Sequence, residues 1–127
     1  MFKAAKAILR HNDSYFLQLR DNKNSIPYPN RWAFFGGRIF ENENPQTGLI
    51  REIEEELSYR LKNPQNFFQW YNPETNTKII YFLVELEKKE IFMNINEGQK
   101  GKWFIRNQLN VIALAPDVNT LIAKSLL

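Results

Sequence analysis

The feature that most constrains the fold of this chain is an amphipathic helical segment whose start is marked by Asn44 and Pro45. Asparagine is a preferred N-cap, and proline suits the first helical position, where its missing N–H costs no hydrogen bond. Projected at about 100° per residue, one side of this helix is aliphatic and needs a sheet or another helix to cover it. The aliphatic positions are Leu49, Ile50, Ile53, Leu57 and Leu61.

A second side of the same helix is acidic. Glu52, Glu55 and Glu56 fall within about 100° of one another, so their carboxylates repel each other. Residues 41–56 hold six acids and one base, Arg51, although the whole protein carries a formal net charge of +3. The pattern predicts either a solvated acidic face or an oxygen cage for a divalent cation. The glycine pair directly upstream favours the cage, because glycine lets a backbone approach a ligand closely.

These residues resemble the signature of the Nudix hydrolase family. Gly37 is followed after five residues by Glu43 and after seven more by residues 51–56, Arg-Glu-Ile-Glu-Glu-Glu, and every charged position of the signature matches. The departure is Ser58, where the family has the glycine that ends the helix, so Tyr59 to Leu61 could continue it. The resemblance implies an α/β fold, an α/β/α sandwich with a mixed β-sheet, in a single Nudix hydrolase domain over residues 1–127.

The resemblance also implies a metal site and a catalytic group. Glu52, Arg51 and Glu43 are the expected catalytic group, with Arg51 pointing away from the acidic face and pairing with Glu43. Glu52 could be a metal ligand or the base that deprotonates water, and the sequence leaves both open. The expected cofactor is Mg²⁺, with Mn²⁺ as the alternative. The implied metal ligands are Glu52, Glu55, Glu56, the carbonyl of Gly37, and Glu97 in the loop before Trp103.

Four residues are candidates for binding the substrate. Arg20 could face the phosphates or be a solvated strand end, and Tyr28 could line the cleft or pack its own loop. Phe35 could stack on a base or belong to the core. Asn119 lies one residue from the position at which MutT-like members of the family read the base.

The remaining pattern predicts strands separated by polar turns, with the glycine pair as a sharp turn. The expected strands are 4–9, 15–19, 32–35, 67–71, 78–87 and 103–105. A short helical or turn segment is expected at 107–112 and a final helix at 116–127.

Composition sets further bounds on function. The absence of cysteine excludes disulfides, thiolate zinc sites and a cysteine nucleophile. No stretch reaches the ~18 apolar residues of a membrane span, so we expect a cytoplasmic protein. We also expect a monomer or a homodimer without a stable nucleic-acid partner. A sequence pI near 9.2 favours polyanionic ligands such as nucleotides.

The expected reaction is Mg²⁺-dependent hydrolysis of a pyrophosphate linkage in a nucleoside diphosphate derivative. A nucleoside triphosphate is the first choice of substrate, as in the MutT-like branch. Nucleotide sugars and dinucleoside polyphosphates are alternatives, and so is a Nudix module that binds a nucleotide without cleaving it.

Overall fold

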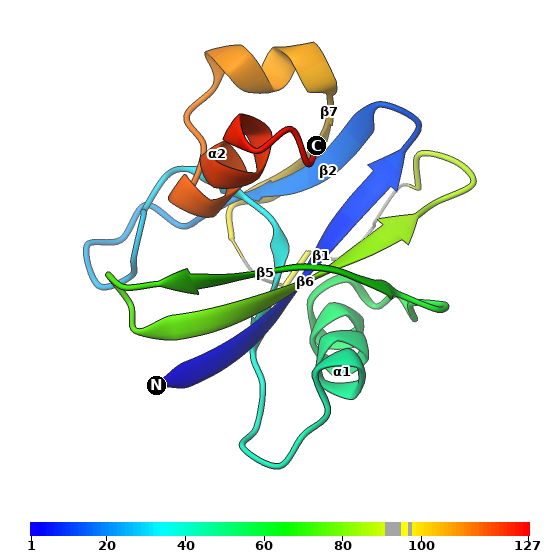
Figure 1. The fold of residues 1–127 in the computed structure, drawn as a ribbon. Helices are drawn as coiled ribbons and strands as arrows, with labels where there is room; N and C mark the ends of the chain where they lie inside the picture. Colours follow the sequence, from blue (N-terminus) through cyan, green and yellow to red (C-terminus); the bar gives the residue numbers. More distant parts are fainter. Residues whose placement is uncertain (91–94, 97) are drawn as a thin grey trace.

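The computed structural model describes residues 1–90, 95–96 and 98–127. Its organising strand is β1 (Phe2–His11), which pairs in parallel with β6 (Thr77–Glu85) over all but its last residue. The other edge of β1 is shared, because β2 (Ser14–Leu19) pairs with its last residues and β4 (Phe35–Arg38) with its middle. The result is a mixed sheet that splits beside β1 (Figure 1).

Three more strands complete this sheet. The edge of β6 is covered by antiparallel β5 (Gln65–Asn72), while β2 carries β3 (Trp32–Ala33) and β7 (Lys100–Ile105). The strands extend one or more residues beyond most of the predicted ranges, because hydrogen bonding continues into the polar turns.

Two helices cover opposite faces of the sheet. α1 (Pro45–Leu57) packs on one face, and α2 (Pro116–Ala123), preceded by the 3₁₀ helix η1 (Arg106–Val111), packs on the other (Figure 1). Along β1 the core residues alternate accordingly: Ala5 and Leu9 join the core under α1, and Ala4 and Ile8 the core under α2. This arrangement confirms the predicted α/β/α sandwich.

The start of α1 agrees with the prediction, and its end shows what Ser58 does. Asn44 Oδ1 accepts a hydrogen bond from Gln46 N at 2.9 Å. The helix stops at Leu57, because Ser58 takes the left-handed conformation (φ 53°, ψ 37°) while its N–H still bonds Glu54 O. A serine therefore occupies a conformation in which glycine is favoured, and the alternative of a helix running to Leu61 is wrong.

The glycine pair is part of strand β4 and is not the predicted sharp turn. Gly36 lies opposite Lys6 and Gly37 opposite Ala5 in the pairing with β1. A Cβ built on Gly36 would lie 2.2 Å from Ala5 O, so glycine is needed there for close strand approach. The chain turns later, at residues 40–43, where Glu43 N bonds Phe40 O at 3.0 Å.

The predicted final helix is shorter than expected. α2 ends at Ala123, and Ser125 has a positive φ of 58°, so the last residues leave the helical path. Within the described ranges, neither helix combines the length and the apolar character needed to cross a membrane.

Candidate active site

The site is built around Arg51, in the middle of α1. Its Nε–H donates to Glu43 Oε2 at 2.9 Å, and its Nη2 donates to Glu43 Oε1 at 3.0 Å. Such a two-point contact fixes both groups more strongly than a single ion pair. The pairing of Arg51 with Glu43 was predicted, and it ties the turn after β4 to the helix.

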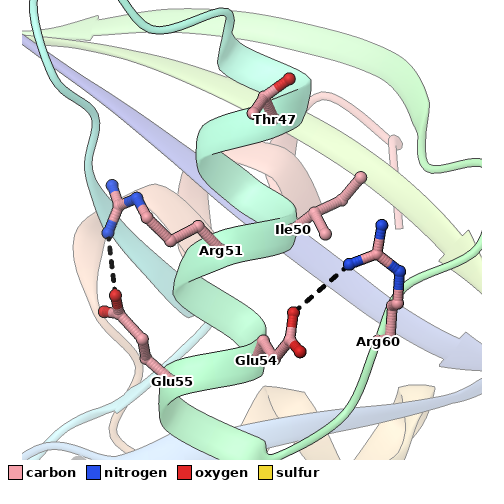
Figure 2. Close-up of a pocket in the computed structure, with 6 residues that line it drawn as sticks. All are labelled: Thr47, Ile50, Arg51, Glu54, Glu55 and Arg60. Carbon is pink, nitrogen blue, oxygen red and sulfur yellow. Dashed lines mark hydrogen bonds and ion pairs between the residues drawn. The ribbon is translucent and has the colours of Figure 1, made fainter.

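Arg51 was expected to point away from the acidic face, and this prediction is wrong. Its Nη1 donates to Glu52 Oε1 at 3.0 Å and to Glu55 Oε1 at 3.3 Å. Figure 2 shows the Arg51 and Glu55 side chains meeting one helical turn apart. The arginine side chain is long enough to carry its guanidinium round the helix. A projection of Cα positions alone therefore places this charge on the wrong side.

We define the acid group as Glu43, Glu52 and Glu55, which contact Arg51, together with Glu56, the residue after Glu55 on α1. Glu55 is the most open, with 60% of its side chain exposed, and Glu52 is mostly covered at 17%. Glu56 is buried, with 4% exposed. Glu55 is therefore the carboxylate that solvent reaches most easily, whereas Glu52 is largely covered and Glu56 is buried.

Gly37 lies directly against Glu52. A Cβ built on Gly37 would lie 2.8 Å from Glu52 Oε2, so a larger residue would displace this carboxylate. The structure thus brings together Gly37 and Glu52, two of the predicted metal ligands, through the close contact of β4 with α1.

Hydrogen bonding to Arg51 lowers the pKa of Glu43 to about 2, and a further bond from the Phe40 N–H at 2.9 Å acts in the same direction. Hydrogen bonds to Glu43, and then to Glu52 and Glu55, raise the pKa of Arg51. Glu43 and Arg51 therefore stay charged throughout the physiological range.

The donor set suits a hard divalent cation. Three carboxylates contact one guanidinium, so these four side chains carry a formal excess of two negative charges. Oxygen ligands in such surplus are what Mg²⁺ takes. In the described part of the chain, no three acidic or histidine side chains already converge on one point as a metal cage.

A cavity of about 370 Å³ opens on the outer side of α1, next to the acid group (Figure 2). Arg51 and Glu55 form one wall, and Glu54, which bonds Arg60 at 3.5 Å, forms another. Thr47 and Ile50 complete the lining.

Two predicted substrate-binding residues lie on or beside the loop 21–31. The Nε–H of Arg20 donates to Pro27 O at 2.9 Å, which holds the guanidinium of this arginine against the loop. The Tyr28 hydroxyl accepts from Asn72 Nδ2 at 3.0 Å and so ties the loop to the end of β5. Arg20 also lines a small cavity of about 80 Å³ with Gln18.

Of the other two substrate candidates, one is buried in the core and one lies on the helix that covers the opposite face of the sheet. Phe35 has no exposed surface and stacks on Phe16 with ring centroids 5.4 Å apart, so of its two alternatives the core one describes it. Asn119 is exposed on α2, across the sheet from α1. Glu97 lies outside the described residues.

Sequence reasoning missed a second polar group, on the face covered by α2. Lys6 and Tyr81 are neighbours across β1 and β6, and both bond Asp117 Oδ2, at 3.0 and 2.9 Å. Burial, and then the Asp117 carboxylate, raise the pKa of Tyr81, so its hydroxyl donates. The available signal was Lys6 at an inward position of the otherwise apolar stretch 4–9.

The chain is similar in sequence and in fold to known proteins. The NUDIX domain family model matches residues 1–124. An 8-oxo-dGTP diphosphatase of Escherichia coli (strain K12) is 30% identical over 100 residues, which cover 75% of this chain and 74% of that protein. The NUDIX domain of Shewanella oneidensis NrtR, solved with ADP ribose, is similar with a TM-score of 0.80 at 16% identity, covering 98% of this chain and 86% of that one. A MutT NUDIX hydrolase from Burkholderia pseudomallei gives a TM-score of 0.79 at 16% identity, covering 96% and 95%.

Proposed function

The chain belongs to the Nudix hydrolase family, and we propose that it hydrolyses nucleoside triphosphates, with Mg²⁺ as the cofactor and Mn²⁺ as a substitute. The observation that carries this proposal is the acid group, in which carboxylates at the family's signature positions surround Arg51. Oxidised nucleoside triphosphates are the first substrates to consider, because the Escherichia coli relative is named an 8-oxo-dGTP diphosphatase.

In this proposal the residues divide the work. Glu55 and Glu56 hold the cation, with the carbonyl of Gly37 and Glu97 as further ligands, and Glu52 acts either as a ligand or as the base for water. When bound, Mg²⁺ supplies the charge that neutralises phosphate oxygens and makes water more acidic. Arg51 and Glu43 set the orientation of the neighbouring carboxylates, a task whose loss is costly in other metal sites.

The substrate end of the proposal rests on Arg20 and Asn119. Arg20 would face the phosphates, since its side chain is held beside the loop 21–31. Asn119 is accessible on α2 for contact with a base. Tyr28 is a candidate for the wall of the base site, although its hydroxyl is already engaged by Asn72.

The test is a Mg²⁺-dependent assay over a nucleotide panel. The purified protein is incubated with ordinary and oxidised nucleoside triphosphates, nucleotide sugars and dinucleoside polyphosphates, and the products are separated to identify the bond cleaved. We expect turnover of a nucleoside triphosphate that EDTA abolishes and Mn²⁺ restores. Faster cleavage of a nucleotide sugar or dinucleoside polyphosphate would move the substrate class, and nucleotide binding without cleavage of any compound would leave only a binding module.

A further inference from the structure

Phe40 is a large aromatic residue that the turn after β4 leaves mostly in solvent. Its exposed fraction is 65%. Yet its ring lies against the acid group, because the Arg51 guanidinium carbon is 4.2 Å from the ring centroid. This distance is well inside the roughly 6 Å at which a guanidinium is attracted to an aromatic face.

The backbone of Phe40 is fixed by the same carboxylate that binds Arg51. The Phe40 N–H donates to Glu43 Oε1 at 2.9 Å, and the Phe40 carbonyl accepts from Glu43 N at 3.0 Å. Glu43 therefore holds Arg51 and Phe40 in one closed arrangement, in which the ring comes over the guanidinium.

The ring contributes something the carboxylates do not. Hydrogen bonds to Glu43, Glu52 and Glu55 all use the N–H donors at the edge of the guanidinium, and its flat faces make no hydrogen bond. Partly exposed ion pairs are weak, because water competes for the charges and long side chains lose freedom when they are held. A ring on one face restricts rotation of the guanidinium and keeps water from that side.

We propose that Phe40 is a positioning residue, whose ring holds Arg51 in the orientation that directs its donors to Glu43 and Glu52. Its effect on turnover rests on the proposed function, because it matters only if Glu52 takes part in the reaction. Its effect on Arg51 itself needs no activity and can be measured in the metal-free protein.

The experiment compares Phe40→Leu with Phe40→Tyr, and uses Phe2→Leu as a matched control. Phe2 is also partly exposed beneath an arginine, with the Arg38 guanidinium carbon 3.8 Å from its ring. Arg38 meets Arg51 through its backbone carbonyl, which accepts from Arg51 Nη2 at 3.4 Å, so Phe2→Leu changes the surroundings of the Arg38 side chain and leaves the ring on Arg51 in place. Nuclear magnetic resonance follows the Nε–H of each arginine, its chemical shift and its exchange with water. The Arg51 signal is assigned by its loss in Arg51→Lys.

We expect Phe40→Leu to shift the Arg51 Nε–H signal and to speed its exchange about two- to fivefold, as loss of an exposed cation–π contact implies. Phe40→Tyr keeps the parent behaviour, and Phe2→Leu changes only Arg38. On a substrate that is turned over, Phe40→Leu lowers kcat by about two- to fivefold with KM unchanged, and Phe40→Tyr restores it.

An Arg51 signal that is the same in Phe40→Leu and in the parent would overturn the proposal, whatever the activity. A changed signal with unchanged kcat would overturn it as well, since the orientation would then serve no catalytic purpose. A parent protein that cleaves no nucleotide would end the proposed function instead, and the resonance comparison would still decide whether the ring orients Arg51.

Discussion

The two polar groups on either side of the sheet differ in how their charges balance. The acid group on α1 sets three carboxylates around the single guanidinium of Arg51, and one of them, Glu55, is open to solvent. The group under α2 sets one carboxylate, Asp117, against one ammonium, Lys6, and one hydroxyl, Tyr81, and it is largely buried. The first has negative charge left over, whereas the second is satisfied within itself.

This contrast separates two uses of polar residues in one fold. A closed buried group needs no ligand, and its main effect is to fix α2 against β1 and β6, because breaking such a pair is costly. A group with surplus like charges is destabilising until a cation joins it. An excess of like charges among contacting side chains therefore indicates a ligand site. Four substitutions test whether the acid group and the group under α2 differ in this way.

The largest effect is expected from Glu56→Gln. Glutamine keeps the shape of this buried side chain but removes one charge, so we expect turnover to fall by roughly 10²–10⁴-fold, comparable to the loss of a positioned acid–base group. Steady-state kinetics with Mg²⁺ measure this, and thermal unfolding controls for folding. If the variant is folded and fully active, the Glu56 carboxylate has no catalytic role, and the acid group does not differ from the group under α2 in the way proposed.

The next effect is on stability, from Asp117→Asn. This change leaves the Lys6 ammonium without its charged partner in a mostly buried position, and we expect a loss of about 3 kcal/mol in the free energy of unfolding. Denaturant titration measures it. Adding Lys6→Met to the same chain should recover most of the loss. A double variant as unstable as the two single changes added together would mean that the group is not a closed pair.

Arg51→Gln tests the link between the acid group and pH. We expect turnover at pH 7 to fall by about 10–100-fold, as for other residues that orient metal ligands. Because Arg51 holds the pKa of Glu43 at about 2, below its ordinary 4.5, Glu43 stabilises the folded parent above pH 4.5, and that contribution is lost as the pH falls through 2.

The melting temperatures of parent and Arg51→Gln should therefore differ most near neutral pH. Their difference should narrow as the pH falls below about 5 and be smallest near pH 2. A difference that stays constant from pH 7 to pH 2 would contradict the assigned role of the Arg51–Glu43 contact.

The smallest effect is expected from Arg60→Ala, which serves as the baseline for both groups. Arg60 meets Glu54 at 3.5 Å with both side chains mostly exposed, and such surface pairs contribute roughly 0–1 kcal/mol. Unfolding and turnover should both stay close to the parent. A loss of activity above tenfold would show that the outer cavity of α1 takes part in the reaction.

The parts of the molecule that sequence reasoning predicted are those that depend on neighbours along the chain. The start of α1 follows from Asn44 and Pro45, and the pairing of Arg51 with Glu43 follows from a motif contained in one turn and one helix. The sandwich fold followed from the resemblance together with the strand pattern. Local interactions decide these features, so a short window of sequence carries them.

The parts that were missed depend on contacts between distant residues. The glycine pair was expected to turn, but pairing of β4 with β1 keeps it extended. Lys6 and Asp117 are 111 positions apart, and nothing local marks them as partners. Phe40 was overlooked because its side chain matters only through Arg51, whose direction depends on three carboxylates at once. Tertiary packing decides these features, and propensity does not contain it.

The position of β1 has a consequence for how the chain folds as it leaves the ribosome. Its parallel partner β6 is made much later, since Phe2 pairs with Thr77 and Arg10 with Glu85. Until then the nascent protein carries an apolar strand with one edge unsatisfied, and such edges promote aggregation. The pairings of β1 with β2 and with β4 can form earlier, but the sheet is complete only when β6 has been made. A chaperone that covers β1 until then should therefore raise the yield of folded protein.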